Sequence, residues 1–414
     1  MEDRLQVGVV RMGCAAVLAG AGWAGAQPVA LPPAPAGVEV TREQGFEFVT
    51  VRGGPQAYAV TPEMPVPGGT NTLGIGYRFL DGTQVGRVDE SYRISRTEVT
   101  AGQYIEMLNM YIGQRTYDGW RTDPLFAAFI DNSVSNEGEY GLDEQGNSRV
   151  FRYVIGPLAN RPVYLSHVES MLYINWLHHG RPTDLNVIRT GVYDAARFIT
   201  LDLLTSNAPG PQRLTIAPAA GARFFIPTQD QWIRAAHFDP NRNGPGQGGF
   251  WQFPNGTDSP SIPGPPGVGS ANIGWDYDPS VGGGRLFAGD IDIASYPDTQ
   301  SPWGLLDTSG NGREWTSTVM YWPDEPSPGD HVWRGWGTVI EGGAAGGSAA
   351  NTEGAIAQNL LDHIGYFDPN GLFPVYGVFG ATRATLRIAA VVPGPTGACV
   401  SLCFVFFTLF RRSR

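Results

Sequence analysis

The chain has 414 residues with a formal net charge of −11, and 42% of its residues are hydrophobic. This composition is typical of a folded acidic protein, because a domain of about 300 residues buries roughly three quarters of the surface that its unfolded chain exposes. All 28 basic residues are Arg and they are scattered along the chain, so the concentrated positive surface that nucleic acid requires is missing and we expect no nucleic-acid partner.

The N-terminus has the residue order of a secretory signal. Arg4 and Arg11 precede the apolar residues 12–23, and the small residues 24–26 follow. This order predicts a signal peptide over residues 1–26, and hence an exported protein located at the cell envelope or outside the cell. A buried hydrophobic helix is the alternative interpretation.

The next segments predict a linker and the first strands. Residues 27–42 contain closely spaced prolines and are predicted as a Pro-rich linker. Apolar and polar side chains alternate over residues 47–51, which predicts a β-strand. The β-branched and aromatic residues 92–95 predict another strand.

Three helices are predicted by the same N-terminal pattern, a hydroxyl side chain followed three residues later by Glu or Gln. The pairs are Thr100 with Gln103, Ser166 with Glu169, and Thr228 with Gln231. The apolar stripes expected to face the core are Tyr104, Leu108 and Tyr111, then Val168, Leu172 and Trp176, then Trp232, Ala235 and Ala236.

Residues 239–303 are dense in Gly, Pro, Asn and Asp, which predicts long ordered loops of the kind that often carry function. Aromatic side chains are frequent in this loop-rich half, and they are candidates for a face that binds a glycan or a peptide, with core packing as the alternative. They are Trp251, Trp275, Tyr277, Trp333 and Trp336.

The C-terminus, residues 391–414, combines a Pro-containing segment, an apolar run from Ala398 to Phe410 and a terminal Arg cluster. The apolar run would make about 20 Å of helix, which is shorter than the roughly 30 Å hydrocarbon core of a bilayer. The pattern resembles PEP-CTERM sorting signals of exported bacterial proteins, although Gly394 stands where Glu is usual. The resemblance implies a transient association with the membrane before processing.

Several short motifs follow one another between these ends. They are residues 95–100 (Ser-Arg-Thr-Glu-Val-Thr), 161–166 (Arg-Pro-Val-Tyr-Leu-Ser), 225–232 (Phe-Ile-Pro-Thr-Gln-Asp-Gln-Trp), 303–307 (Trp-Gly-Leu-Leu-Asp), 310–315 (Gly-Asn-Gly-Arg-Glu-Trp), 346–348 (Gly-Gly-Ser) and 386–389 (Leu-Arg-Ile-Ala). The last of them is predicted as the terminal strand. In order and spacing, residues 43–390 resemble one domain of the formylglycine-generating enzyme (sulfatase-modifying factor) family. The resemblance implies an α+β domain with a C-type-lectin-like fold, loop-rich, with short twisted sheets and a few helices.

Oxygen ligands for calcium are spaced within residues 307–314. The carboxylates of Asp307 and Glu314 and the carbonyls of Gly310 and Gly312 form a set that Ca²⁺ favours. The resemblance implies a structural calcium at these positions. Asn272 and Ile273 match the start of a second calcium loop, whose acidic partner, with Asp290 as a candidate, stays unassigned. An ordinary polar turn is the alternative.

The chain has three cysteines, Cys14, Cys399 and Cys403, and all lie in the predicted signal peptide or the C-terminal tail. The resemblance implies catalysis by two cysteines that hold copper, yet the corresponding residues 347–390 contain none. Because Cu(I) requires soft thiolate ligands, we expect no copper and assign no catalytic residue.

The histidines give no alternative catalytic centre in the sequence. Of the six, only His178 and His179 are adjacent, and they fall at the end of a predicted helix, where solvated imidazoles suit the helix dipole. The leading hypothesis is therefore a non-catalytic, calcium-stabilised binding or structural module. The alternatives are an oxidoreductase of the same superfamily with a non-cysteine metal site, and a pseudoenzyme that partners an active paralogue.

Overall fold

The computed structural model describes residues 29–59, 76–78, 84–111, 138–142, 148–153, 159–163, 165, 167–195, 212–272, 291–322, 335–341, 363–367 and 384–393. The predicted signal peptide, residues 1–26, and the tail beyond residue 393 lie outside this description.

Two five-stranded sheets organise the described residues, and all their strands pair antiparallel. The first sheet has the order β1 (Val40–Glu43), β2 (Phe46–Val51), β6 (Tyr92–Ser95), β16 (Ala389–Val391) and β10 (Phe224–Phe225). The second has the order β4 (Gly76–Arg78), β15 (His363–Phe367), β14 (Gly335–Glu341), β13 (Glu314–Trp322) and β9 (Gln212–Thr215). Three two-stranded ribbons pair β3 (Tyr58–Ala59) with β5 (Gln84–Val85), β7 (Gly138–Leu142) with β8 (Ser148–Tyr153), and β11 (Phe238–Asp239) with β12 (Gly249–Phe250).

Helices are few in the described part of the chain. They are α1 (Ala101–Tyr111), α4 (His167–His178), α6 (Gln229–His237) and the short 3₁₀ helix η2 (Leu185–Arg189). The molecule is therefore a mixed helix and sheet protein with short antiparallel sheets, as the sequence predicts. None of these helices is long and apolar enough to cross a membrane.

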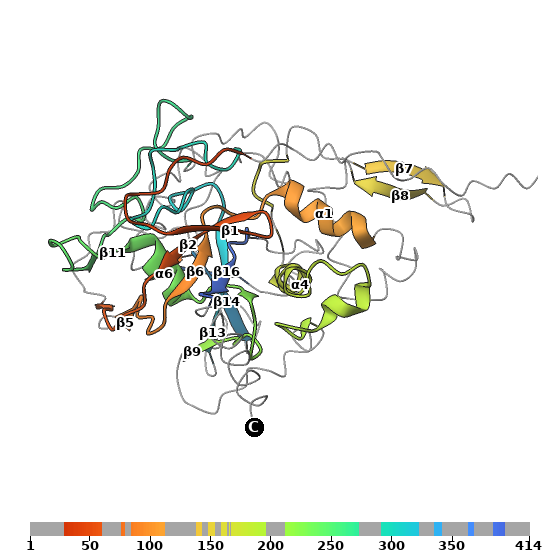
Figure 1. Cartoon of the computed structure of the whole chain (residues 1–414), viewed down its shortest axis with the longest axis horizontal. Coiled ribbons are helices and arrows are strands. Elements are labelled where there is room, and N and C mark those ends of the chain that lie inside the picture. The colour runs from red at the N-terminus through yellow and green to blue at the C-terminus, as the bar shows by residue number, and fades with distance from the viewer. Residues whose placement is uncertain are drawn as a thin grey trace, which may run out of the picture.

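The first sheet is a central layer that is covered on both faces. Phe46 and Phe48 of β2 join the hydrophobic cluster of α1 and α4, whereas Val49 and Val51 join the cluster of α6. Because successive side chains of a strand point to opposite faces, β2 contributes side chains to both hydrophobic clusters. Figure 1 shows α1 and α4 on one side of β2, β6 and β16 and α6 on the other.

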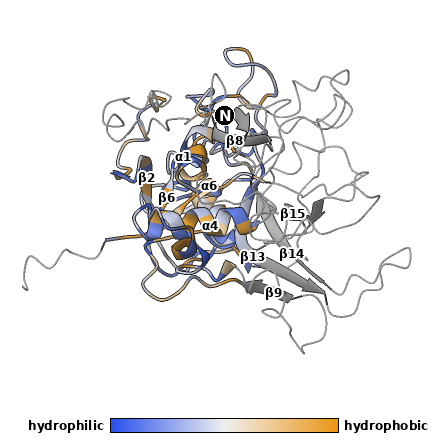
Figure 2. Ribbon diagram, turned by 90° about the vertical axis from the view of Figure 1, so that its right-hand side faces the viewer, coloured by the Kyte–Doolittle hydropathy of each residue, from blue (hydrophilic) through white to orange (hydrophobic). Residues whose placement is uncertain are grey.

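Helix α4 is buried on almost every side. Its residues from His167 to Leu177 are all buried, and Figure 2 shows hydrophilic and hydrophobic segments mixed along it. The polar groups are paired inside: Asn175 Nδ2 donates to the carbonyls of Ile188 and Tyr193, and its Oδ1 accepts from the Tyr193 amide at 2.9 Å. This pairing holds η2 and the following loop against α4.

The predicted helix starts are confirmed for α1 and α6. Thr100 Oγ1 accepts from the Gln103 amide at 3.3 Å while Gln103 Oε1 accepts from the Thr100 amide at 2.9 Å. Thr228 and Gln231 exchange the same two bonds. The second predicted helix is present as α4, and its predicted cap, Ser166, lies outside the described residues.

Two predicted boundaries differ from the structure. Residues 40–42, predicted as the end of a linker, belong to strand β1, because the backbone from Val40 to Glu43 pairs with β2. The last strand begins at Ala389 rather than at Leu386. Residues 386–388 carry the buried side chain of Arg387 into the core, and the carbonyls of Leu386 and Ile388 accept from the amides of Val99 and Ser95.

Candidate functional site

A bidentate ion pair lies at the junction of the two sheets. Arg387 donates from Nη2 to Glu314 Oε1 at 2.8 Å and from Nε to Oε2 at 2.9 Å, and both side chains are fully buried. Trp232 Nε1 of α6 also donates to Glu314 Oε2, at 2.7 Å. Glu314 is the first residue of β13, so this pair joins β13, α6 and the segment that leads into β16.

Two further carboxylates are buried beside this pair. Thr385 Oγ1 donates to Glu98 Oε1 at 2.7 Å, and the Ala294 amide donates to Asp307 Oδ2 at 2.7 Å. Burial, reinforced by the carboxylates of Glu314 and Asp307, raises the pKa of Glu98 well above its usual range. Burial also raises the pKa of Asp307 to about 6. Three buried carboxylates, those of Glu98, Asp307 and Glu314, thus lie near one guanidinium group, that of Arg387.

A small cavity of about 10 Å³ lies next to Asp307. Its lining includes Asn272, Ser309, Gly310 and Asn311. Asn272 Nδ2 donates to Asn311 Oδ1 at 3.2 Å, and the Asn311 amide donates to the Asn272 carbonyl at 3.0 Å. A cavity of this size is close to the roughly 10–15 Å³ that one water-sized particle requires.

The structure thus brings together part of the predicted calcium set. Asp307 and Gly310 share the small cavity with Asn272, which the sequence assigned to a second calcium loop. Gly312 and Glu314 do not line it: Gly312 packs against Thr385 and Glu98, and Glu314 pairs with Arg387. Ile273 and Asp290 lie outside the described residues.

The buried histidines His167 and His237 each contact a backbone carbonyl. His167 Nε2 is 3.1 Å from the Thr316 carbonyl, and His237 Nδ1 is 3.1 Å from the Trp251 carbonyl. His178 and His179 have ring centroids 5.3 Å apart, and His179 is exposed. Within the described ranges no three His, Cys, Asp or Glu side chains are grouped so that they could hold a metal ion.

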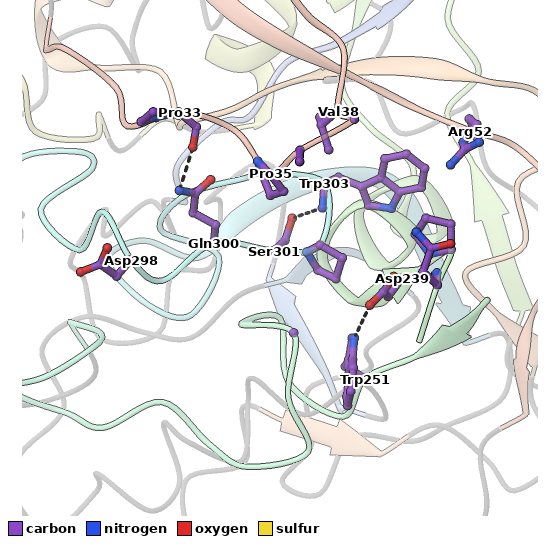
Figure 3. Close-up of a pocket in the computed structure, with 16 residues that line it drawn as sticks. Pro33, Pro35, Val38, Arg52, Asp239, Trp251, Asp298, Gln300, Ser301 and Trp303 are labelled. Atoms are coloured by element: carbon purple, nitrogen blue, oxygen red, sulfur yellow. Dashed lines mark hydrogen bonds between the residues drawn. The ribbon is translucent and has the colours of Figure 1, made fainter. Parts of the chain in front are cut away.

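A wider cleft lies elsewhere among the described residues, between the N-terminal segment and the loop that ends at Trp303. Its volume is 680 Å³, and its lining includes Arg52, Asp239, Trp251, Asp298 and Trp303. Figure 3 shows the N-terminal Pro33 and Pro35 on one wall and Asp239 and Trp251 on another. Sequence reasoning selected Trp251 from the aromatic content of the loops, but it missed Arg52 and Asp239, which no motif distinguishes from other surface charges.

The sequence matches the model of one protein family over most of its length. Residues 39–359 match the family model described as "Sulfatase-modifying factor enzyme 1-like domain". No curated protein matches the chain in sequence.

Two solved structures are similar over most of their length. "Treponema denticola variable protein 1" shares 14% identity with a TM-score of 0.42, and the match covers 86% of this chain and 99% of that chain. The structure titled "Crystal Structure of CarF" shares 14% identity with a TM-score of 0.39, and the match covers 84% of this chain and 99% of that chain. Because the family model spans most of the sequence, the chain belongs to the family of sulfatase-modifying factor enzyme 1-like domains.

Proposed function

We propose that the chain is an exported, non-catalytic member of this family, a calcium-stabilised binding or structural module at the cell envelope or outside the cell. The observation that carries the proposal is the absence of cysteine from residues 15–398. The order of residues 1–26 and 391–414 supports export and a transient contact of the tail with the membrane. The mixed helix and short-sheet architecture supports a C-type-lectin-like fold.

The residues present do not fit the copper that the family's oxidation requires. Thiolate is the soft ligand that Cu(I) selects, and carboxylate or hydroxyl oxygen does not replace it. The carboxylates of Glu98, Asp307 and Glu314 are hard ligands, and Glu314 is occupied by Arg387 and Trp232. We therefore assign no oxidation step to this chain.

The residues around Asp307 do fit calcium. Ca²⁺ takes carboxylate, amide and carbonyl oxygens, and Asp307, Asn272 and Gly310 offer one of each beside the 10 Å³ cavity. A bound divalent cation would also offset the cost of holding the buried Asp307 carboxylate away from water. Calcium would act here as a structural ion that ties the loop around Asn272 to the loop that precedes β13.

Thermal melting tests the calcium proposal. The full-length protein should melt at a higher temperature in calcium than in chelator, because an ion that binds only the folded state stabilises it. Asp307→Asn should reduce this difference, whereas Asp292→Asn, a change at an exposed carboxylate, should preserve it. Equal melting temperatures in calcium and in chelator would show that the calcium part of the proposal is wrong.

Metal analysis and a peptide assay test the non-catalytic role. We expect calcium alone in the purified protein and no conversion of a peptide thiol to an aldehyde in the presence of oxygen. Stoichiometric iron or copper would favour an oxidoreductase with a non-cysteine metal site. If the isolated protein formed the aldehyde, the proposal would be wrong. Activation of a cysteine-containing paralogue by this chain would instead identify it as a pseudoenzyme partner.

A further inference from the structure

The cleft beside Trp303 has the dimensions of a ligand site. Its 680 Å³ volume falls within the range of about 300–1,000 Å³ that small-molecule sites occupy. It is separate from the cavity beside Asp307, since the two linings share no residue. Most of its lining comes from three distant parts of the sequence, residues 33–38, 239–241 and 298–303, and Arg52, Trp251 and Gly256 complete it.

The charges around the cleft favour a neutral ligand. The charged side chains in its lining are Arg52, Asp239 and Asp298. Asp239 is already engaged, because its Oδ1 accepts from the Asn241 amide at 2.7 Å and its Oδ2 accepts from Trp251 Nε1 at 3.2 Å. Arg52 and Asp298 remain as one positive and one negative group, both exposed. A phosphate or sulfate group would need a concentration of positive charge that these side chains do not provide.

The polar groups of the cleft are complementary at its two ends. Figure 3 shows Asp298 at one end and Arg52 at the other, with Gln300, Ser301 and Trp303 between them. The carboxylate of Asp298 only accepts hydrogen bonds, whereas the guanidinium of Arg52 only donates them. A ligand that spans the cleft must therefore donate at one end and accept at the other, which is what a row of hydroxyl groups does.

Trp303 supplies a second and independent indication of a ligand. Its side chain is 4% exposed, and its Nε1–H has no hydrogen-bond partner among the described residues. The Arg52 guanidinium lies 5.7 Å from the centre of the indole ring, so two donors stand at the same end of the cleft. A buried indole N–H that lacks an acceptor is costly. The N–H is closed to solvent, so the indole must turn slightly for an oxygen of a bound ligand to accept from it.

The apolar part of the lining is rigid. The Trp251 ring is held by its bond to Asp239 and by the Arg242 guanidinium, which lies 4.4 Å from the ring centre. On the N-terminal wall, the Pro33 carbonyl accepts from Gln300 Nε2 at 3.2 Å. Gly304 has a φ of +84°, and a Cβ there would lie 2.8 Å from Pro35 Cδ, so Gly304 lets this wall pack closely. Ordered indole and proline surfaces suit the C–H faces of sugar rings without a cost of ordering side chains on binding.

We propose that this cleft binds a neutral oligosaccharide, whose hydroxyl groups pair with Asp298, Arg52 and Trp303 Nε1 while its ring faces contact Trp251 and the proline wall. This inference deepens the proposed function, since it rests on the role of a binding module and names its ligand class.

Calorimetric titration of the full chain with neutral oligosaccharides tests the inference, using cellotetraose, mannotetraose and N-acetylated chitotetraose as probes. We expect at least one of them to bind. Trp303→Phe keeps an aromatic ring, which is smaller than the indole, and removes the N–H, so it should weaken binding about tenfold. Asp298→Ala should also weaken binding several-fold, because it removes an acceptor at the other end.

Two matched variants control for effects on folding. Trp176→Phe makes the same change at another buried indole whose N–H has no partner among the described residues, but which does not line the cleft. Asp292→Ala removes an exposed carboxylate outside the cleft. Both should bind the saccharide as the unmodified chain does.

Three results would overturn the inference. They are the absence of binding by every neutral saccharide, binding that Trp303→Phe and Asp298→Ala leave unchanged, and competition for the cleft by a sulfated saccharide or a peptide with higher affinity. These failures are distinguishable from failure of the proposed function, because the calcium-dependent melt and the aldehyde assay do not depend on saccharide binding.

Discussion

At the scale of one residue, the packing around Gly312 leaves no room for a side chain. A Cβ at Gly312 would overlap the Thr385 methyl group and lie 2.6 Å from Glu98 Oε1. Thr385 and Glu98 are bonded to each other and fully buried, so neither moves away easily. The volume that a side chain at position 312 would occupy is thus filled by these two residues.

Gly312→Ala should destabilise the fold, and urea denaturation should show a loss of about 1–3 kcal/mol in the free energy of unfolding. Thr385→Ser removes the obstructing methyl group and keeps the hydroxyl that donates to Glu98. The double variant should therefore recover part of the loss. Equal stability of Gly312→Ala and the unmodified chain would contradict this account of the packing.

His167 and His237 predict a loss of stability in acid. Burial lowers the pKa of each imidazole to about 4, below the value of about 6.5 that an unfolded chain shows. Between these values the unfolded state binds more protons, so this contribution is present above about pH 6.5 and is lost as the pH falls toward 4.

His237→Gln should reduce the acid sensitivity of unfolding. Each buried imidazole contributes at most about 1.4 kcal/mol per pH unit within that window. We expect the free energy of unfolding, measured in urea at pH 7, 6 and 5, to fall less steeply for the variant than for the unmodified chain. His179→Gln, at an exposed imidazole, is the control and should leave the slope unchanged.

At the scale of elements, the helices depend on their caps and on the two faces of the first sheet. The reciprocal bonds of Thr228 and Gln231 fix the start of α6, which places Trp232 against Glu314. Helix α6 has nine residues, too short to be stable alone. Its cap and its contact with β2 and β6 must therefore act together.

Thr228→Ala should cost about 1 kcal/mol of stability, because it leaves the Gln231 amide without its acceptor. Thr228→Ser retains the hydroxyl and should remain close to the unmodified chain. Hydrogen exchange of the amides in the first turn of α6 should be faster in Thr228→Ala than in Thr228→Ser or the unmodified chain. A Thr228→Ala protein with unchanged exchange in that turn would disprove the capping role.

At the scale of the whole molecule, Arg387 joins segments that are far apart in the sequence. Besides Glu314, it donates to the carbonyls of Ser95 at 3.1 Å and Leu306 at 2.8 Å. One guanidinium thus links β6, the loop that carries Asp307 and the start of β13. Its positive charge also interacts with three buried carboxylates, those of Glu314, Glu98 and Asp307.

Arg387→Met should be the most damaging of these substitutions, with a loss of about 3–5 kcal/mol, because it leaves Glu314 charged and unpaired in the interior. Adding Glu314→Gln should restore part of the stability, since the amide carries no charge. Denaturation in urea would measure both effects. If the single and double variants were equally unstable, the backbone bonds of Arg387 rather than the ion pair would account for its role.

Sequence patterns were sufficient to predict the starts of α1 and α6, strands β2 and β6 and the family of the chain. Composition alone shows that residues 15–398 contain no cysteine. The helix starts and strands are predictable because periodicity and capping act over a few neighbouring residues. The partners of the site residues depend on contacts between segments that are distant in sequence. Asp307 and Glu314 belong to the same predicted calcium set, yet the structure gives them different partners. Glu314 forms an ion pair with Arg387, which is distant in sequence, and Asp307 lines a cavity together with Asn272. The cleft at Trp303 likewise forms mostly from three segments that share no sequence pattern. Long-range packing determines which of their side chains meet, and no local pattern encodes that packing.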